Sequence, residues 1–189
     1  MTDSTPTANV TSPSALSVFR NRNFTLLWSA QLISTMGSAL TSLAAAILVY
    51  RLTGSALSVG LMLMASAAPS ILLGLIAGVF VDRFDRKRIM LISDLIRAGL
   101  VFLIPLVISS NIAWLYIIVM LTGAVGQFFD PAQSSLLPEV ATDEELAAAN
   151  SLMAISSIGS TTIGFAVSGL LAASNIELAF YLDALSFLI

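Results

Sequence analysis

The sequence predicts an all-α integral membrane protein, and three observations support that fold class. Hydrophobic residues make up 57% of the 189 residues and charged residues only 10%, whereas soluble domains carry about 25% charged residues. The apolar residues gather in runs long enough to cross a bilayer, which takes about 20 residues per helix. The few charges gather mainly between these runs, and we therefore expect six membrane helices joined by aqueous turns.

The composition also argues against several kinds of function. The chain has no Cys and no His, which removes thiol chemistry, the usual zinc sites and the commonest general base. Only eight Lys and Arg are present, too few for a nucleic-acid surface. No catalytic sequence pattern stands out, and we expect no enzyme activity, no metal and no cofactor.

The helices are expected within residues 19–189, after a polar tail. Residues 1–18 lack the basic and apolar segments of a cleavable signal and predict a disordered cytoplasmic tail. The apolar runs predict helices at about 24–50, 56–81, 89–108, 112–136, 148–173 and 178–189. The last run, about 12 residues or 18 Å, is short against a hydrocarbon core of about 30 Å. We therefore expect a truncated sixth helix in a fragment of a longer protein.

The first helix carries a polar stripe. Hydroxyl and amide side chains recur at three- and four-residue spacing, which places them on one helix face. They are Gln31, Ser34, Thr35, Ser38, Thr41 and Ser42. Such a stripe faces other helices or a water-filled cavity. Two roles are therefore possible for the stripe. It could form hydrogen bonds between helices, or Gln31, Ser34, Thr35 and Ser38 could line a substrate pathway.

The later helices are marked by prolines and charges. Pro69 lies at the middle of the second helix and permits a kink. Asp94 and Arg97 lie three residues apart in the third, hence on one face. The fourth carries Asp130 towards its far end. Asp183, in the outer half of the sixth helix, is expected to stand apart from these charges as a further candidate cavity-lining residue.

The most highly charged segment is Asp82–Arg88, between the second and third helices. It holds six charges in seven residues, and each charge in hydrocarbon would cost about 2.5–3.5 kcal/mol or more. If the helices alternate, this loop, the tail and the loop at 138–147 share one side. That side holds six of the eight basic residues. The positive-inside rule then predicts a cytoplasmic N-terminus in a multi-pass protein of the cell membrane.

This topology puts five ionisable residues in the cytoplasmic half of the bundle: Asp82, Arg86, Asp94, Arg97 and Asp130. They should pair, because an unpaired charge in a low-dielectric site is costly. One interpretation is a structural network that joins helix ends. Another is a gate whose pairs break and re-form as two halves rock, and a third is direct proton binding by carboxylates within the helices.

Several motifs resemble those of the major facilitator superfamily. Residues 78–88 are similar to its loop signature, G-x-x-x-D-R-x-G-R-K/R, with Asp85 where Gly is common. The matching signature positions are Gly78, Asp82, Arg86, Lys87 and Arg88. Further segments resemble the subgroup of bacterial exporters that includes enterobactin-exporter-like and macrolide-efflux-like proteins: Thr53–Ala56, Asp94–Arg97, Phe129–Ala132, Leu137–Glu139 and Glu145–Asn150.

The resemblance implies specific roles. The chain would be the N-terminal six-helix half of a twelve-helix transporter. Asp82 and Arg86 would engage Asp130 in a charge relay, and the gate would also include Arg83, Asp94 and Arg97. The segment 163–169 is similar to the antiporter signature G-P-x-x-G-G, with Phe165 and Ser168 at two of its positions.

The resemblance also implies a function. It is secondary active efflux of a small amphipathic compound, such as a drug, a macrolide or a siderophore-like molecule, by alternating access coupled to protons. The partners would be this substrate, protons, the lipid bilayer and a C-terminal half, with no nucleic acid. A non-transporting membrane assembly protein and a half-transporter acting as a homodimer are the alternatives.

Overall fold

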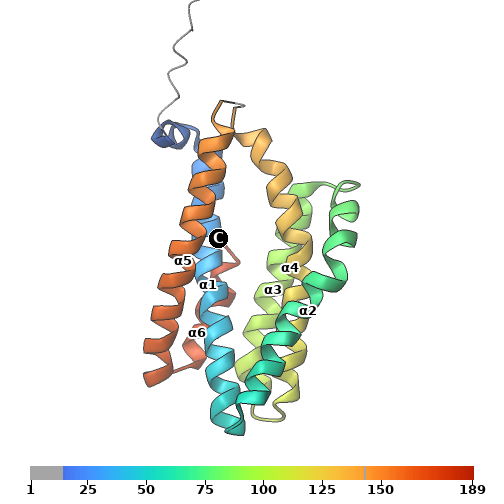
Figure 1. Ribbon diagram of the computed structural model, residues 1–189, viewed down its shortest axis with the longest axis vertical. Coiled ribbons are helices and arrows are strands. Elements are labelled where there is room, and N and C mark those ends of the chain that lie inside the picture. Colours follow the sequence, from blue (N-terminus) through green and yellow to red (C-terminus); the bar gives the residue numbers. More distant parts are fainter. Residues whose placement is uncertain (1–14, 143) are drawn as a thin grey trace, which may run out of the picture.

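The computed structural model describes residues 15–142 and 144–189, and every regular element in this part of the chain is helical (Figure 1). The elements are η1 (Ala15–Arg20), α1 (Arg22–Thr53), α2 (Ala56–Val81), α3 (Arg86–Val107), α4 (Ala113–Val140), α5 (Leu146–Ser174) and α6 (Glu177–Ser186). The predicted all-α class is therefore confirmed. The predicted helix ends differ from these by no more than four residues, the largest difference being at the end of α4, at Val140 instead of 136.

Five helices, α1 to α5, are long and apolar enough to cross a membrane. Their outward surfaces carry large apolar side chains, and Leu75 of α2 is 91% exposed. In water such a surface would be unfavourable, whereas lipid solvates it. The sixth helix is present but has ten residues, or about 15 Å at the helical rise. The bundle is therefore that of a multi-pass membrane protein.

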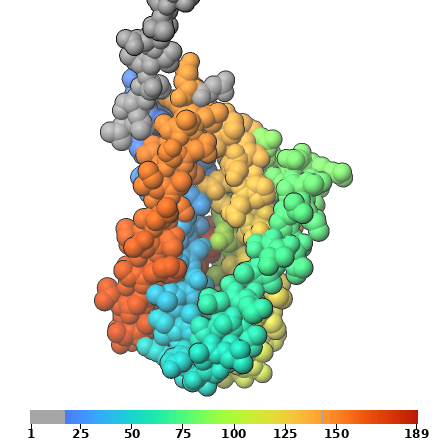
Figure 2. All heavy atoms as spheres, in the orientation of Figure 1, coloured from blue at the N-terminus to red at the C-terminus, as the bar shows by residue number. Residues whose placement is uncertain are grey.

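The helices pack as two related groups of three. The helix α1 packs against α5 and α6, and α4 packs against α2 and α3. If α1 is exchanged with α4, α2 with α5 and α3 with α6, each of these contacts maps onto another. The contact between α3 and α6 maps onto itself. This is the pattern of an internal repeat related by a pseudo-two-fold axis. Between α1 and α5 on one side and α2 and α4 on the other, the surface is hollowed (Figure 2).

The N-terminal segment is packed more closely than the sequence predicted. Residues 1–14 of the predicted disordered tail lie outside the described residues, but η1 already begins at Ala15. Val18 is fully buried with Phe24 and Leu137 in a small core at the ends of α1, α4 and α5. The tail prediction is therefore wrong for its last residues. Burial of Val18 contributes to the free energy that orders them.

The side chain of Asn21 fixes the start of α1. It accepts hydrogen bonds from the backbone N–H groups of Asn23 and Phe24, at 3.0 and 3.4 Å, which satisfies donors that a helix start leaves free. Its amide also donates to the carbonyl oxygen of Val140 at the end of α4. One asparagine thus caps α1 and ties it to α4.

Hydrogen bonds connect α1 and α5 near both ends and near the middle of their interface. Three hydrogen bonds cross it: Trp28 Nε1 to Ser156 Oγ at 2.8 Å, Ser168 Oγ to the carbonyl oxygen of Leu40 at 2.9 Å, and Arg51 Nη2 to the carbonyl oxygen of Ala172 at 2.7 Å. Near its middle the helices touch at Gly164. A Cβ built there would lie 2.5 Å from the carbonyl oxygen of Met36 and 2.7 Å from the Cβ of Ala39. Only a glycine allows this approach.

We predict that Gly164→Ala destabilises the protein by about 1–3 kcal/mol, because the added methyl group forces α1 and α5 apart. The matched control is Gly159→Ala on the same helix, where an added Cβ meets nothing within 4 Å. It should be neutral or stabilising by up to about 1 kcal/mol, because Ala favours the helix. Thermal unfolding in detergent, followed by circular dichroism, measures both; equal midpoints would contradict the packing described.

Candidate functional site

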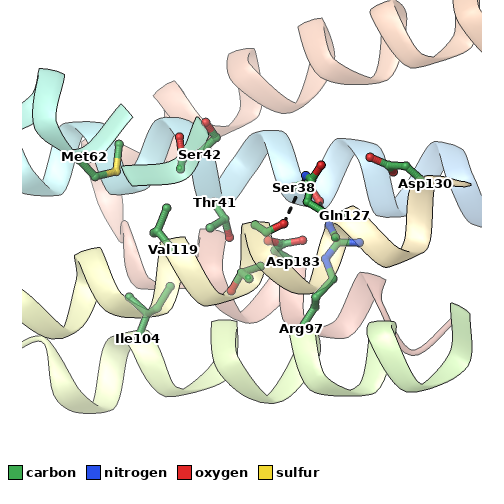
Figure 3. A pocket seen from close by; sticks show the side chains of 14 residues that line it. Ser38, Thr41, Ser42, Met62, Arg97, Ile104, Val119, Gln127, Asp130 and Asp183 are labelled. Atoms are coloured by element: carbon green, nitrogen blue, oxygen red, sulfur yellow. Dashed lines mark hydrogen bonds between the residues drawn. The ribbon is translucent and has the colours of Figure 1, made fainter. Parts of the chain in front are cut away.

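One interior site is a cavity of about 280 Å³ between α1, α2 and α4, which residues of α3 and α6 also line. Its two ends differ in chemistry (Figure 3). Arg97, Gln127, Asp130 and Asp183 gather at one end with Ser38, and Met62, Ile104 and Val119 line the other. Residues of α1, α2, α3, α4 and α6 thus line one amphipathic cavity, and small-molecule sites commonly lie between the helices of a bundle in this way.

Arg97 of α3 is the cation of this site. Its Nη1 lies 3.7 Å from Oδ1 of Asp94, and its Nη2 donates a hydrogen bond of 3.2 Å to Oγ of Ser38 on α1. Its guanidinium carbon lies 4.1 Å from the ring centroid of Phe187 and 5.8 Å from that of Phe129. A buried guanidinium is stable when a carboxylate, a hydroxyl and aromatic rings replace water in this way. The expected pairing of Asp94 with Arg97 is therefore present.

Asp183 of α6 lies in the same cavity as Arg97 and is only 1% exposed. The expectation that it stands apart was wrong. The two helices enter the bundle from opposite ends: Asp183 is about 9 Å from the start of α6 and Arg97 about 17 Å from the start of α3. In a core of about 30 Å these depths nearly coincide. A sequence reading that treats each helix by itself misses this convergence.

Gly37 of α1 makes room for Asp183. A Cβ built on Gly37 would lie 2.6 Å from Oδ1 of Asp183 and would also collide with Ser186. The Ser186 hydroxyl donates to the Asp183 carbonyl oxygen at 2.7 Å and lies 3.4 Å from its Oδ1. The carboxylate thus fits against α1 only because that helix has no side chain at residue 37.

The structure does not bring Asp82, Arg86 and Asp130 together. Arg86 forms an ion pair with Glu139 at the end of α4, and it donates a 3.1 Å hydrogen bond to the carbonyl oxygen of Ser135. Asp130 lies nine residues before Glu139, about 14 Å along α4, and lines the cavity instead. Glu139 was not expected as a partner of Arg86, because only the packing of α3 on α4 selects it.

The remaining loop residues are largely solvent-exposed. Asp82, Arg83, Lys87 and Arg88 are exposed, and Gly78 has open space around it. Asp85 caps α3, since its carboxylate accepts a 2.9 Å hydrogen bond from the backbone N–H of Arg88. This explains how an aspartate serves where the loop signature usually has glycine.

The polar stripe of α1 divides between two cavities. Ser38, Thr41 and Ser42 line the first. Gln31 and Ser34 line a second cavity of about 660 Å³, mainly apolar, which also includes Asp94 and the last residues of the chain. Thr35 lines neither of these cavities; its hydroxyl accepts a 3.2 Å hydrogen bond from the amide of Gln31.

Comparison with known proteins gives a family and several relatives. Residues 13–189 match the family described as transmembrane secretion effector. An uncharacterised transporter of the major facilitator type from Bacillus subtilis, YfiS, is 35% identical over 90% of this chain and 41% of its own length. Macrolide efflux protein A of Streptococcus pyogenes is 32% identical over 65% of this chain and 31% of its own.

A further relative is the multidrug efflux pump Tap of Mycolicibacterium fortuitum, which is 35% identical over 61% of this chain and 30% of its own length. The chain therefore spans about two fifths or less of the length of these relatives. No solved structure matches the chain significantly.

Proposed function

Because the chain belongs to the transmembrane secretion effector family of major facilitator transporters, we propose that it is the N-terminal half of a secondary active exporter. The exporter moves a small amphipathic compound, such as a drug, a macrolide or a siderophore-like molecule, out of the cell by alternating access. The observation that carries this proposal is the cavity with Arg97, Asp130 and Asp183 inside a lipid-facing bundle. Ionisable groups at that depth are expensive and are retained for transport pathways.

The names of two relatives support both the outward direction of transport and the proposed kind of substrate. One is a macrolide efflux protein and another a multidrug efflux pump. An amphipathic cavity suits compounds that partition between water and lipid. The matched relatives are more than twice as long as this chain, and a cavity enclosed between two halves of a transporter would need the remaining part.

The gate proposed for this exporter lies where α2 ends, α3 begins and α4 ends, with Asp82, Arg83 and Arg86 at its mouth and Asp130 farther along α4, in the lining of the cavity. The ion pair of Arg86 with Glu139 joins α3 to α4 there, and its side chains are 37% and 57% exposed. Such exposed pairs contribute only about 0–1 kcal/mol. A weak pair suits a gate, because it can break and re-form as the halves rock. Asp94 and Arg97 lie deeper, where the gate would meet the cavity.

Proton coupling is the proposed energy source. Three carboxylates lie within the helices, on Asp94, Asp130 and Asp183. Each could take up a proton on one side of the membrane and release it on the other as the transporter changes conformation. Protons and substrate would then compete for the same interior charges.

We predict that Asp82→Asn in the full-length transporter lowers efflux about tenfold, a change equivalent to about 1.4 kcal/mol, while abundance in the membrane stays near normal. Glu144→Gln, an exposed carboxylate in the loop between α4 and α5, is the matched control and should change neither. A substrate-panel accumulation assay in cells, with and without a protonophore, measures efflux, and an immunoblot measures abundance.

Four outcomes would contradict parts of the proposal. If abundance falls in step with efflux, Asp82 is structural and not part of a gate. If export persists when the proton gradient is dissipated, the coupling is not to protons. If the reconstituted 189-residue chain exports substrate by itself, the functional unit is a homodimer of half-transporters, and if the full-length protein exports nothing, a membrane assembly role replaces transport.

The proposed orientation places the N-terminus and the loop between α2 and α3 in the cytoplasm. The chain has no cysteine, so a single introduced cysteine is the only thiol. A membrane-impermeant maleimide added to intact cells should label Ser110→Cys in the turn after α3, and should label Lys87→Cys only after permeabilisation. The opposite pattern would invert the topology.

A further inference from the structure

The charged end of the cavity carries more negative than positive charge. Its lining includes Arg97 together with Asp130 and Asp183. Within the described residues the ion pairs are Arg86 with Glu139 and Arg97 with Asp94. Asp130 and Asp183 therefore have no ion pair within 4 Å among residues 15–142 and 144–189, and the single positive charge of Arg97 faces three carboxylates, those of Asp183, Asp94 and Asp130.

Buried hydroxyl groups without partners point into the same cavity. Thr41 is only 8% exposed and lines the cavity, and its hydroxyl lies next to the Asp183 carboxylate without a hydrogen bond of good geometry within the described residues. The hydroxyl of Thr122 on the facing helix α4 is also unpartnered and lines the cavity. An unsatisfied buried hydroxyl costs about 1–3 kcal/mol. A ligand or water that donates hydrogen bonds to these oxygens removes that cost.

The lining favours an organic cation over the other small ligands. An anion would meet both carboxylates, and Arg97 offers little to it, because Asp94, Ser38 and two aromatic rings already surround the guanidinium. A metal ion would lack ligands, since the described residues contain no cluster of three or more side chains suited to one. An organic ammonium group has N–H donors and carries an apolar body, and the three carboxylates of Asp94, Asp130 and Asp183 outweigh its repulsion by the guanidinium of Arg97.

The size and shape of the cavity set which part of a substrate it takes. Pockets that bind drug-sized molecules measure about 300–1,000 Å³, and this cavity of 280 Å³ lies just below that range. The apolar end, with Met62, Ile104 and Val119, receives hydrocarbon next to the charged group (Figure 3). The cavity thus accommodates a charged head group and the hydrocarbon attached to it.

We propose that this cavity is a binding site for the ammonium head group of an amphipathic organic cation. Asp130 and Asp183 balance the ligand charge, and Thr41 and Thr122 accept its hydrogen bonds. The inference rests on the proposed function, because it names the chemical class that the exporter carries. It also applies to the 189-residue chain alone, because every residue that it invokes belongs to this chain.

The test uses three probes with one apolar cage and different charges: 1-adamantylammonium, neutral 1-adamantanol and adamantane-1-carboxylate. Binding to the 189-residue chain in lipid nanodiscs is measured by equilibrium dialysis, and uptake by empty nanodiscs is subtracted. We expect the ammonium probe to bind at least about tenfold more tightly than either of the others, which corresponds to about 1.4 kcal/mol or more.

The variants assign the preference to individual side chains. Asp130→Asn and Asp183→Asn should each weaken binding of the ammonium probe about tenfold and leave binding of the alcohol unchanged. Thr41→Val should weaken binding of the ammonium probe a few-fold. The matched control is Glu177→Gln, which removes an exposed carboxylate from the same helix as Asp183 and should change nothing. If Asp183→Asn unfolds, Asp130→Asn at its exposed position and Thr41→Val still decide the question.

Several results would overturn the inference. Equal binding of the ammonium and the alcohol would mean a merely apolar cavity, and tightest binding of the carboxylate would mean an anion site at Arg97. Unchanged binding in Asp130→Asn and Thr41→Val would place the cation elsewhere. If the full-length protein exports substrate but the 189-residue chain shows no preference for the ammonium probe, this binding site is refuted and the proposed export function stands. If the chain prefers the ammonium probe but the full-length protein exports nothing, the binding site stands and the proposed export function is refuted.

Discussion

The interior of this protein depends on how the positive charge of Arg97 is compensated. Moving a charge out of water costs several kcal/mol even after relaxation, and Arg97 lies inside a bundle whose surface faces lipid. The compensation comes from Asp94 one turn away, from the hydroxyl of Ser38 and from the rings of Phe129 and Phe187. These groups belong to α1, α3 and α4 and to the residue that follows α6. One guanidinium therefore constrains how four helices meet.

Close backbone contacts around α1 make this arrangement possible. Gly37 admits the carboxylate of Asp183 from α6, and Gly164 of α5 touches the other side of α1. By contrast, the ends of α3 and α4 are joined by the exposed pair of Arg86 and Glu139. The middle of the bundle is thus held by close packing and the proposed gate by a weak ion pair. That difference would let the helix ends move while the cavity keeps its shape.

Much of the fold could be predicted from the sequence, because runs of apolar residues define membrane helices by length alone. The errors occurred where tertiary contacts decide. The fourth helix was predicted to end at about residue 136, yet α4 continues to Val140, whose carbonyl oxygen accepts a hydrogen bond from Asn21. Spacing along α3 predicted the pair of Asp94 with Arg97. It could not place Asp183 beside them or select Glu139 as the partner of Arg86, because both depend on which helices pack together and at what depth.

The most direct test of this account is the thermal stability of Arg97→Met in detergent. Breaking a buried pair leaves its carboxylate uncompensated, so the account predicts a loss of about 3–5 kcal/mol. The double variant Arg97→Met with Asp94→Asn should recover a large part of it, because no unpaired charge from that pair then remains. Arg83→Met, at an exposed loop position, should stay within about 0.5 kcal/mol of the parent. If Arg97→Met is as stable as Arg83→Met, the compensation of Arg97 is not what organises the bundle.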